Sequence, residues 1–274
     1  MPIQNSINTN IGAFVALQNL NSVNSRPDTV QNRVSTGLKV NSAVEDASSF
    51  AIAQGIRGNL KAYEAVSQGL ANGCGVATVT LAGATAISDL LGDIQKKITE
   101  GQNAGNSTEQ QSILNSDFSN LVSQINTFIT NATYNGRNLL SFGSSSLNVI
   151  GNVDGTTLTI RSNSAFAVTS TALGAQQISS TVAATKALSI LFTATASINQ
   201  VLGNLGADTR TLNFQETFIS KLSDAVSEGL GAIVDADLAK ESSRLQALQV
   251  QQQLSVQTLN IANQKPSGLL SLFR

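Results

Sequence analysis

Apolar residues recur along most of the chain at spacings of three and four, with polar residues between them. Near the N-terminus this stripe consists of Ile7, Ile11, Phe14 and Leu17. Such a period places apolar side chains on one face of a helix. The stripes are narrow, and a narrow stripe on a long polar helix is buried only against another helix. The pattern therefore predicts helices with coiled-coil packing in residues 1–140 and 181–274.

Breaks divide the first helical region. Arg26-Pro27-Asp28 interrupts it because a proline pushes the preceding residue out of the helical conformation, although Pro27 also suits the first turn of a new helix. Turn-forming residues predict a loop over residues 38–46, and a long helix is expected from there to residues 101–106. Ser107 and Thr108 are candidate caps for the helix that follows.

Residues 141–180 show a different pattern. Two short runs, residues 147–150 and 158–160, alternate apolar and polar positions and are rich in β-branched residues. They are joined by Asn152-Val153-Asp154-Gly155, whose Asp-Gly step favours a tight hairpin turn. A pair of strands this short is not stable alone. The sequence therefore predicts a mainly α fold with a small central β-hairpin region.

Composition removes several kinds of function. The chain has no His and one cysteine, Cys74, with small apolar neighbours, which excludes Ser-His and Cys-His nucleophiles, a disulfide within the chain and a cysteine-rich zinc site. Asp235 and Asp237, or Glu241 with Lys240, lie on an amphipathic helix without a pocket, so we interpret them as a solvated face. We predict no enzymatic activity, no catalytic residue, no cofactor and no metal.

Charge and hydropathy exclude two classes of partner. The formal net charge is -1 without a run of Lys or Arg, so no nucleic-acid partner is expected. No membrane insertion is expected either, because the most apolar stretch, about Gly75 to Leu91, is interrupted by Thr, Ser, Gly and Asp. The N-terminus lacks the basic region and apolar core of a cleavable export signal.

The two ends and the end of the first helical region carry recognisable motifs. They are Ser6–Asn10, Ser35-Thr36-Gly37-Leu38-Lys39-Val40-Asn41-Ser42-Ala43, Thr133-Tyr134-Asn135-Gly136-Arg137-Asn138-Leu139-Leu140, Leu238-Ala239-Lys240-Glu241-Ser242, Gln251–Leu254, Leu259–Gln264 and Leu269–Arg274. In order and placement these motifs resemble those of bacterial flagellins, and the short central region is most similar to the small flagellins of alphaproteobacteria.

The resemblance implies a fold and a function. It implies a long antiparallel coiled-coil rod, with residues 1–40 and 235–274 as a paired terminal core domain. Residues 41–140 and 181–234 would form a helical shell domain, and residues 141–180 a short β-rich variable region. The function it implies is a structural subunit that polymerises into the extracellular flagellar filament for swimming motility.

The same resemblance implies the partners. They are many copies of the same chain, alone or mixed with paralogous flagellins, together with a flagellar export chaperone, the type III export apparatus, the filament cap and the hook-junction proteins. Export of the unfolded chain through that apparatus would account for the missing cleavable signal. The alternative function is a hook-filament junction or type III needle-tip-like rod protein, and an enzyme on a helical scaffold is a third hypothesis.

The chain ends are the candidate assembly interface. Each end has one thin apolar stripe and many Asn, Gln and Ser residues, so neither is expected to hold a stable helix alone, and both are expected to fold on assembly. A contact repeated by a rotation that does not close produces a helical filament. The candidate interface residues are Ile7, Ile11, Phe14, Leu17, Leu245, Leu248, Leu259, Leu269, Leu272 and Phe273.

Hydroxyl-rich segments near the centre are candidates for modification. Flagellins often carry O-glycans on exposed surface, and a plain solvated loop is the alternative reading. The candidate O-glycosylation residues are Ser144, Ser145, Ser146, Ser162, Ser164, Thr169, Ser170 and Thr171.

Overall fold

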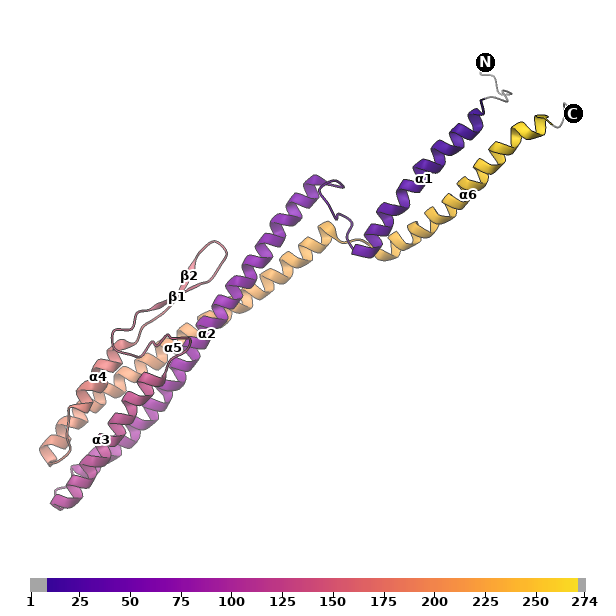
Figure 1. Ribbon diagram of the computed structural model, residues 1–274. Helices are drawn as coiled ribbons and strands as arrows, with labels where there is room; N and C mark the ends of the chain where they lie inside the picture. Colours follow the sequence, from indigo (N-terminus) through magenta and orange to yellow (C-terminus); the bar gives the residue numbers. More distant parts are fainter. Residues whose placement is uncertain (1–8, 271–274) are drawn as a thin grey trace. The chain divides into compact units, whose positions relative to one another are not determined.

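A computed structural model describes residues 9–270 of the chain, and the side chains of residues 9–264 (Figure 1). The elements in these residues are α1 (Ile11–Thr36), α2 (Ala47–Gly101), α3 (Thr108–Asn131), β1 (Leu147–Ile150), β2 (Thr157–Ile160), α4 (Ser164–Gly174), α5 (Thr181–Val234) and α6 (Leu238–Leu270). The predicted mainly α fold with a small two-stranded sheet is confirmed.

The chain divides into two compact units. The terminal unit comprises Met1–Gly58 and Ala225–Arg274, and the central unit comprises Asn59–Asp224. The terminal unit contains α1 and α6, and the central unit contains α3, α4 and both strands, together with most of α2 and α5.

Local capping signals decide where the helices begin and end. The Asn10 side chain accepts a hydrogen bond from the N–H of Ala13 at the start of α1, and Gly37 ends that helix with a left-handed φ of 72°. Ser107 and Gln110 form a reciprocal capping box at the start of α3. The predicted loop before α2 and the predicted Ser107 cap are confirmed.

The expected break at Pro27 is wrong. Helix α1 runs without interruption through Pro27, which lies inside it. Proline has no N–H, so the carbonyl of Val23 loses its helical partner. On either side of Pro27, Val23 and Val30 are buried. Tertiary packing of this face therefore outweighs the local penalty of one proline.

The expectation that residues 141–180 form a β-rich region is also wrong in part, because the segment contains a helix as well as the hairpin. Helix α4 lies in this segment and packs on α3. Its buried residues Phe166, Ala167, Ser170 and Leu173 share one helical face. The helix is short and rich in Ser and Thr, so its apolar face is difficult to recognise without the neighbouring helix.

The predicted hairpin is present. Strands β1 and β2 are antiparallel, with Leu147 opposite Ile160 and Ile150 opposite Thr157. Gly155 has a φ of 81° at the end of the connecting turn, and its N–H donates a hydrogen bond to the carbonyl of Asn152 at 3.1 Å. After β2, Arg161 binds Asp208 of α5 through its backbone N–H, Nε and Nη2, with Nη2 to Oδ1 at 2.8 Å. This clamp anchors the hairpin to α5.

The hydrophobic core of the central unit lies between α2, α3, α4, α5 and the hairpin. Its largest fully buried side chains include Leu70, Ile87, Ile94, Phe118 and Leu173. Within the described residues, α2 and α5 are long and apolar enough to cross a membrane. Length and composition do not distinguish a membrane span from a core helix, and both helices contribute buried residues to this core.

Candidate assembly surface on the paired ends

The two ends of the chain pair as antiparallel helices, α1 with α6 (Figure 1). Asn10 Nδ2 donates a hydrogen bond to the carbonyl of Ala262 at 2.8 Å, and Gln252 Nε2 donates to Asn24 Oδ1 at 2.9 Å. Residue numbers rise along α1 as they fall along α6, which defines the antiparallel direction.

Two backbone hydrogen bonds join the chain segments at the other end of the helix pair. Lys39 N–H donates to the carbonyl of Val234 at 2.6 Å, and Ala236 N–H donates to the carbonyl of Gly37 at 2.9 Å. The segment that leaves α1 and the segment that enters α6 are therefore held together as a short bridge.

A charged cluster lies beside this bridge. Glu241 is 8% exposed, and its Oε1 lies 3.8 Å from Arg33 Nη1 and 3.9 Å from Arg244 Nη1. Both distances exceed that of a hydrogen bond. Arg33 Nε and Glu241 Oε2 are buried without a hydrogen-bond partner in the described part of the chain. The cluster contributes charge complementarity rather than well-made hydrogen bonds.

The seam between the helices is narrow. On α1 the buried residues are Ala16, Val23 and Val30, and on α6 Leu248 is 7% exposed. Small side chains predominate in this seam, so it buries little apolar area. The helix pair consequently depends on few interior contacts within a single chain.

The predicted N-terminal stripe lies outside this seam. Ile11 is 49% exposed, Phe14 64% and Leu17 43%. The neighbouring Val15 is 52% exposed. The stripe was expected to be buried against another helix, but within one chain α6 covers a different face of α1. A large apolar face therefore remains uncovered on α1.

Helix α6 also exposes apolar residues that the sequence interpretation did not include in the interface. Val250, Leu254, Val256 and Ile261 are each at least two-fifths exposed. Val250, Leu254 and Ile261 are spaced i, i+4 and i+11 and share one face of the helix, so helical periodicity could have identified them, whereas Val256 lies on another side. Both helices thus have a buried face toward each other and apolar residues that face outward.

The remaining predicted interface residues have different positions. Leu248 is buried in the seam, and Leu245 and Leu259 are partly buried. The side chain of Leu269 lies outside the described residues, as do Ile7, Leu272 and Phe273.

The candidate glycosylation residues differ in their accessibility. Ser170 is 1% exposed and donates a hydrogen bond to the carbonyl of Ala167, so a glycan there would disrupt the core, and we exclude Ser170 from the candidates. The hydroxyls of Ser144 and Ser162 lie 2.8 Å apart and are partly buried. Ser145 and Ser146 are exposed, Ser164 and Thr169 are partly exposed, and Thr171 is exposed.

Asp237, one of the acidic residues near the start of α6, caps the first turn of that helix. Asp237 Oδ1 accepts a hydrogen bond from the N–H of Lys240 in the first turn of α6 at 3.1 Å. In the part of the chain that the structure describes, no group of His, Cys, Asp and Glu is arranged to hold a metal ion.

These features define a helical structural subunit whose ends pair and expose apolar faces. Residues 7–144 match the bacterial flagellin N-terminal helical region, and residues 188–273 match the bacterial flagellin C-terminal helical region. The chain therefore belongs to the bacterial flagellin family, whose members are structural subunits of the flagellar filament.

Individual relatives agree with this assignment. The chain is 39% identical over 271 residues to flagellin FljK of Caulobacter vibrioides, covering 98% of this chain and 99% of the relative. It is 37% identical over 287 residues to a flagellin of Brucella melitensis, covering 98% and 99%. The crystal structure of Bacillus cereus flagellin matches with a TM-score of 0.50 and 16% identity, covering 55% of this chain and 88% of that chain.

The comparisons distinguish between the functions considered from the sequence. They support a filament subunit and do not favour a hook-filament junction or needle-tip-like protein. The resemblance to alphaproteobacterial flagellins is also confirmed, because relatives from Caulobacter and Brucella match nearly the whole chain.

Proposed function

We propose that the chain polymerises into an extracellular flagellar filament through the outward apolar faces of α1 and α6. The observation that carries the proposal is the exposure of Ile11, Phe14 and Leu17 on a helix whose other face α6 already covers. A neighbouring copy that covers these side chains removes apolar surface from water, which favours association.

Assembly is coupled to the stability of the helix pair. Helices with a narrow apolar seam are marginal in water, and the α1–α6 seam is made largely of Ala and Val. Contacts with neighbouring copies would stabilise both helices, at the expense of the entropy lost on ordering them. The ends are therefore expected to fold fully when the subunit is incorporated.

The proposed domains correspond to ranges of the chain. Residues 1–40 and 235–274 form the terminal core domain, residues 41–140 and 181–234 the shell domain, and residues 141–180 the variable region. The backbone bridge of Gly37 and Lys39 with Val234 and Ala236 lies beside the proposed boundary between core and shell, which supports that boundary.

The proposed partners follow from family membership. Flagellins FljK, FljO and FljM come from one organism, Caulobacter vibrioides, and all match nearly the full chain. This supports a filament made of this chain alone or mixed with paralogues. An export chaperone, the type III export apparatus, the filament cap and the hook-junction proteins complete the proposed set.

A triple substitution tests the assembly surface. The variant Ile11→Ser, Phe14→Ser, Leu17→Ser removes the outward face of α1 and leaves the seam residues unchanged. A matched control replaces Gln18, Asn21 and Thr29, exposed polar residues of the same helix, with Ser. Assembly is followed by negative-stain microscopy after addition of salt.

The proposal expects long filaments from the unmodified chain and the control, and only monomers from the triple variant. A second variant that lacks residues 238–274 is expected to remain monomeric. Filaments of normal length and yield from the triple variant would show that the outward face of α1 is not an assembly surface.

A further inference from the structure

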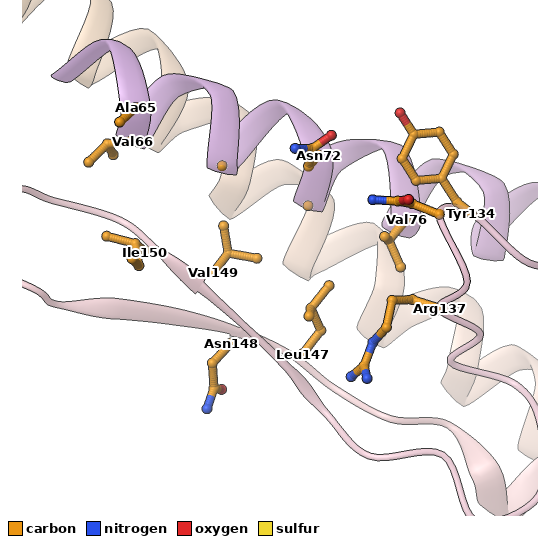
Figure 2. A pocket seen from close by; sticks show the side chains of 13 residues that line it. Ala65, Val66, Asn72, Val76, Tyr134, Arg137, Leu147, Asn148, Val149 and Ile150 are labelled. Atoms are coloured by element: carbon orange, nitrogen blue, oxygen red, sulfur yellow. The ribbon is translucent and has the colours of Figure 1, made fainter. Parts of the chain in front are cut away.

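A hollow of about 320 Å³ lies between α2 and β1 within the central unit (Figure 2). Val66 and Val76 of α2 line one wall, and Leu147 and Val149 of β1 line the other. The turn that contains Tyr134 and Arg137 lies at one end. Small-molecule sites are concave and mostly apolar, with volumes of about 300–1,000 Å³, so the hollow is of a size for a small ligand.

Two glycines of α2 line the hollow, and they differ in the space beside them. A Cβ at Gly73 would lie 2.7 Å from Val149 Cγ2, so β1 makes close contact with the helix at that point. One turn earlier, a Cβ at Gly69 would meet nothing within 4 Å. Glycine inside a helix lowers its stability relative to alanine. Because Gly69 lines the hollow and has no neighbour within 4 Å of its Cβ position, a larger side chain could enter the hollow there without a clash.

A single positive charge, on the exposed side chain of Arg137, lies at the open edge of this apolar space. Arg137 is the charged residue among those that line the hollow, and no carboxylate lines it. The Arg137 side chain has no ion-pair partner in the described part of the chain. Asn72 adds an amide at the rim. A guanidinium without a partner beside apolar walls is complementary to an anion attached to an apolar body.

We propose that the hollow is a binding site for a small amphiphilic monoanion, with one sulfonate or carboxylate and an aromatic or alkyl body. The apolar body lies between α2 and β1, and the anionic group meets the guanidinium of Arg137. The site belongs to the central unit alone and does not depend on the filament role of the chain ends.

Titration of the full-length monomer with 8-anilinonaphthalene-1-sulfonate tests the anionic part of the proposal. Arg137→Gln removes the charge at the hollow, and Lys96→Gln removes one charge from an exposed position elsewhere on α2. Comparison of the paired variants cancels dye that binds to the chain ends. Arg137→Gln is expected to weaken binding about fivefold, as for loss of an exposed charge-assisted hydrogen bond, and Lys96→Gln to leave it unchanged.

The neutral dye N-phenyl-1-naphthylamine lacks the sulfonate and serves as the matched probe. Its affinity is expected to be the same for the unmodified chain and Arg137→Gln. Equal weakening of the sulfonate dye by both charge variants, or equal weakening of both dyes by Arg137→Gln, would overturn the proposed contact with an anion.

Filling the hollow tests its location. Gly69→Leu adds a side chain that the open space accommodates, and Gly92→Leu makes the same change at an exposed position of α2 where a Cβ also meets nothing within 4 Å. Gly69→Leu is expected to weaken dye binding on the order of tenfold because it occupies the site, whereas Gly92→Leu is expected to have no effect. Circular dichroism establishes that both variants are folded.

The same pair of variants distinguishes the ligand from a second copy of the chain. If Gly69→Leu impairs polymerisation while dye binding persists, the hollow accommodates a neighbouring subunit, and the ligand proposal is overturned. Loss of dye binding with normal polymerisation supports the proposal.

Discussion

Replacement of Phe14 by alanine is the most direct quantitative test of the outward face of α1. Phe14 is 64% exposed in the single chain. A phenylalanine has roughly 150–250 Å² to bury, so roughly 100–160 Å² of Phe14 remains for a neighbouring copy to cover. At about 25 cal/mol per Å², complete cover would stabilise each added subunit by about 3 kcal/mol.

The assay is the critical concentration for assembly, measured by sedimenting filaments and quantifying the chain that remains in solution. The alanine side chain still buries part of the area that phenylalanine would bury, so we expect the association free energy of each subunit to weaken by about 2 kcal/mol. This loss raises the critical concentration about thirtyfold. The helix content of the monomer should not change, because Phe14 lies outside the α1–α6 seam.

Leu248→Ala provides the opposite case. Leu248 is buried in the seam, so its truncation should lower the helix content or thermal stability of the terminal unit before any assembly occurs. The outcome that refutes the Phe14 prediction is assembly of Phe14→Ala at the same critical concentration as the unmodified chain. Phe14 would then not be covered in the filament, and this face of α1 would not be an assembly surface.

Three further predictions concern the monomer. Backbone amides of α1 and α6 should exchange hydrogen faster than those in the middle of α2 and α5, and should become protected in filaments, because few residues are buried in the terminal seam. A hydrogen bond from the Ser49 hydroxyl, and then one from its N–H, lower the pKa of Asp46 at the start of α2. The stabilising contribution of the Asp46 carboxylate is therefore present above the ordinary aspartate pKa and is lost as pH falls through the lowered pKa. The variant Asp46→Ala should be less stable than the unmodified chain at pH 7 and equally stable in strong acid. Circular dichroism measures this stability. Asp208→Asn should weaken the clamp on Arg161 and lower the free energy of unfolding of the central unit by about 1 kcal/mol, measured by urea denaturation, with no change if the clamp is not stabilising.

Much of the local structure was accessible from residue types. The capping box at Ser107, the turn at Gly155 and the end of α1 at Gly37 each depend on side-chain or backbone chemistry within a few residues. The family was also recognisable, because its motifs lie at both ends and at the end of the first helical region. These features require no knowledge of distant contacts.

Other features depended on contacts between distant residues. The apolar periodicity of α4 is weak, and the helix is recognisable only by its packing on α3. Helix α1 continues through Pro27 because Val23 and Val30, on either side of it, are buried. The hollow beside Gly69 could not be predicted either, because a glycine in a helix does not show whether a strand fills the space next to it.

The candidate assembly surface combines both kinds of information. Periodicity established that α1 has an apolar stripe at Ile11, Phe14 and Leu17, because a helical repeat of 3.6 residues places those side chains on one side. It did not establish what covers that stripe. Helix α6 packs instead on Ala16, Val23 and Val30, and this choice of partner face leaves the larger stripe exposed. A chain's pattern shows which faces are apolar, whereas the packing of segments distant in sequence determines which of those faces stay open to another molecule.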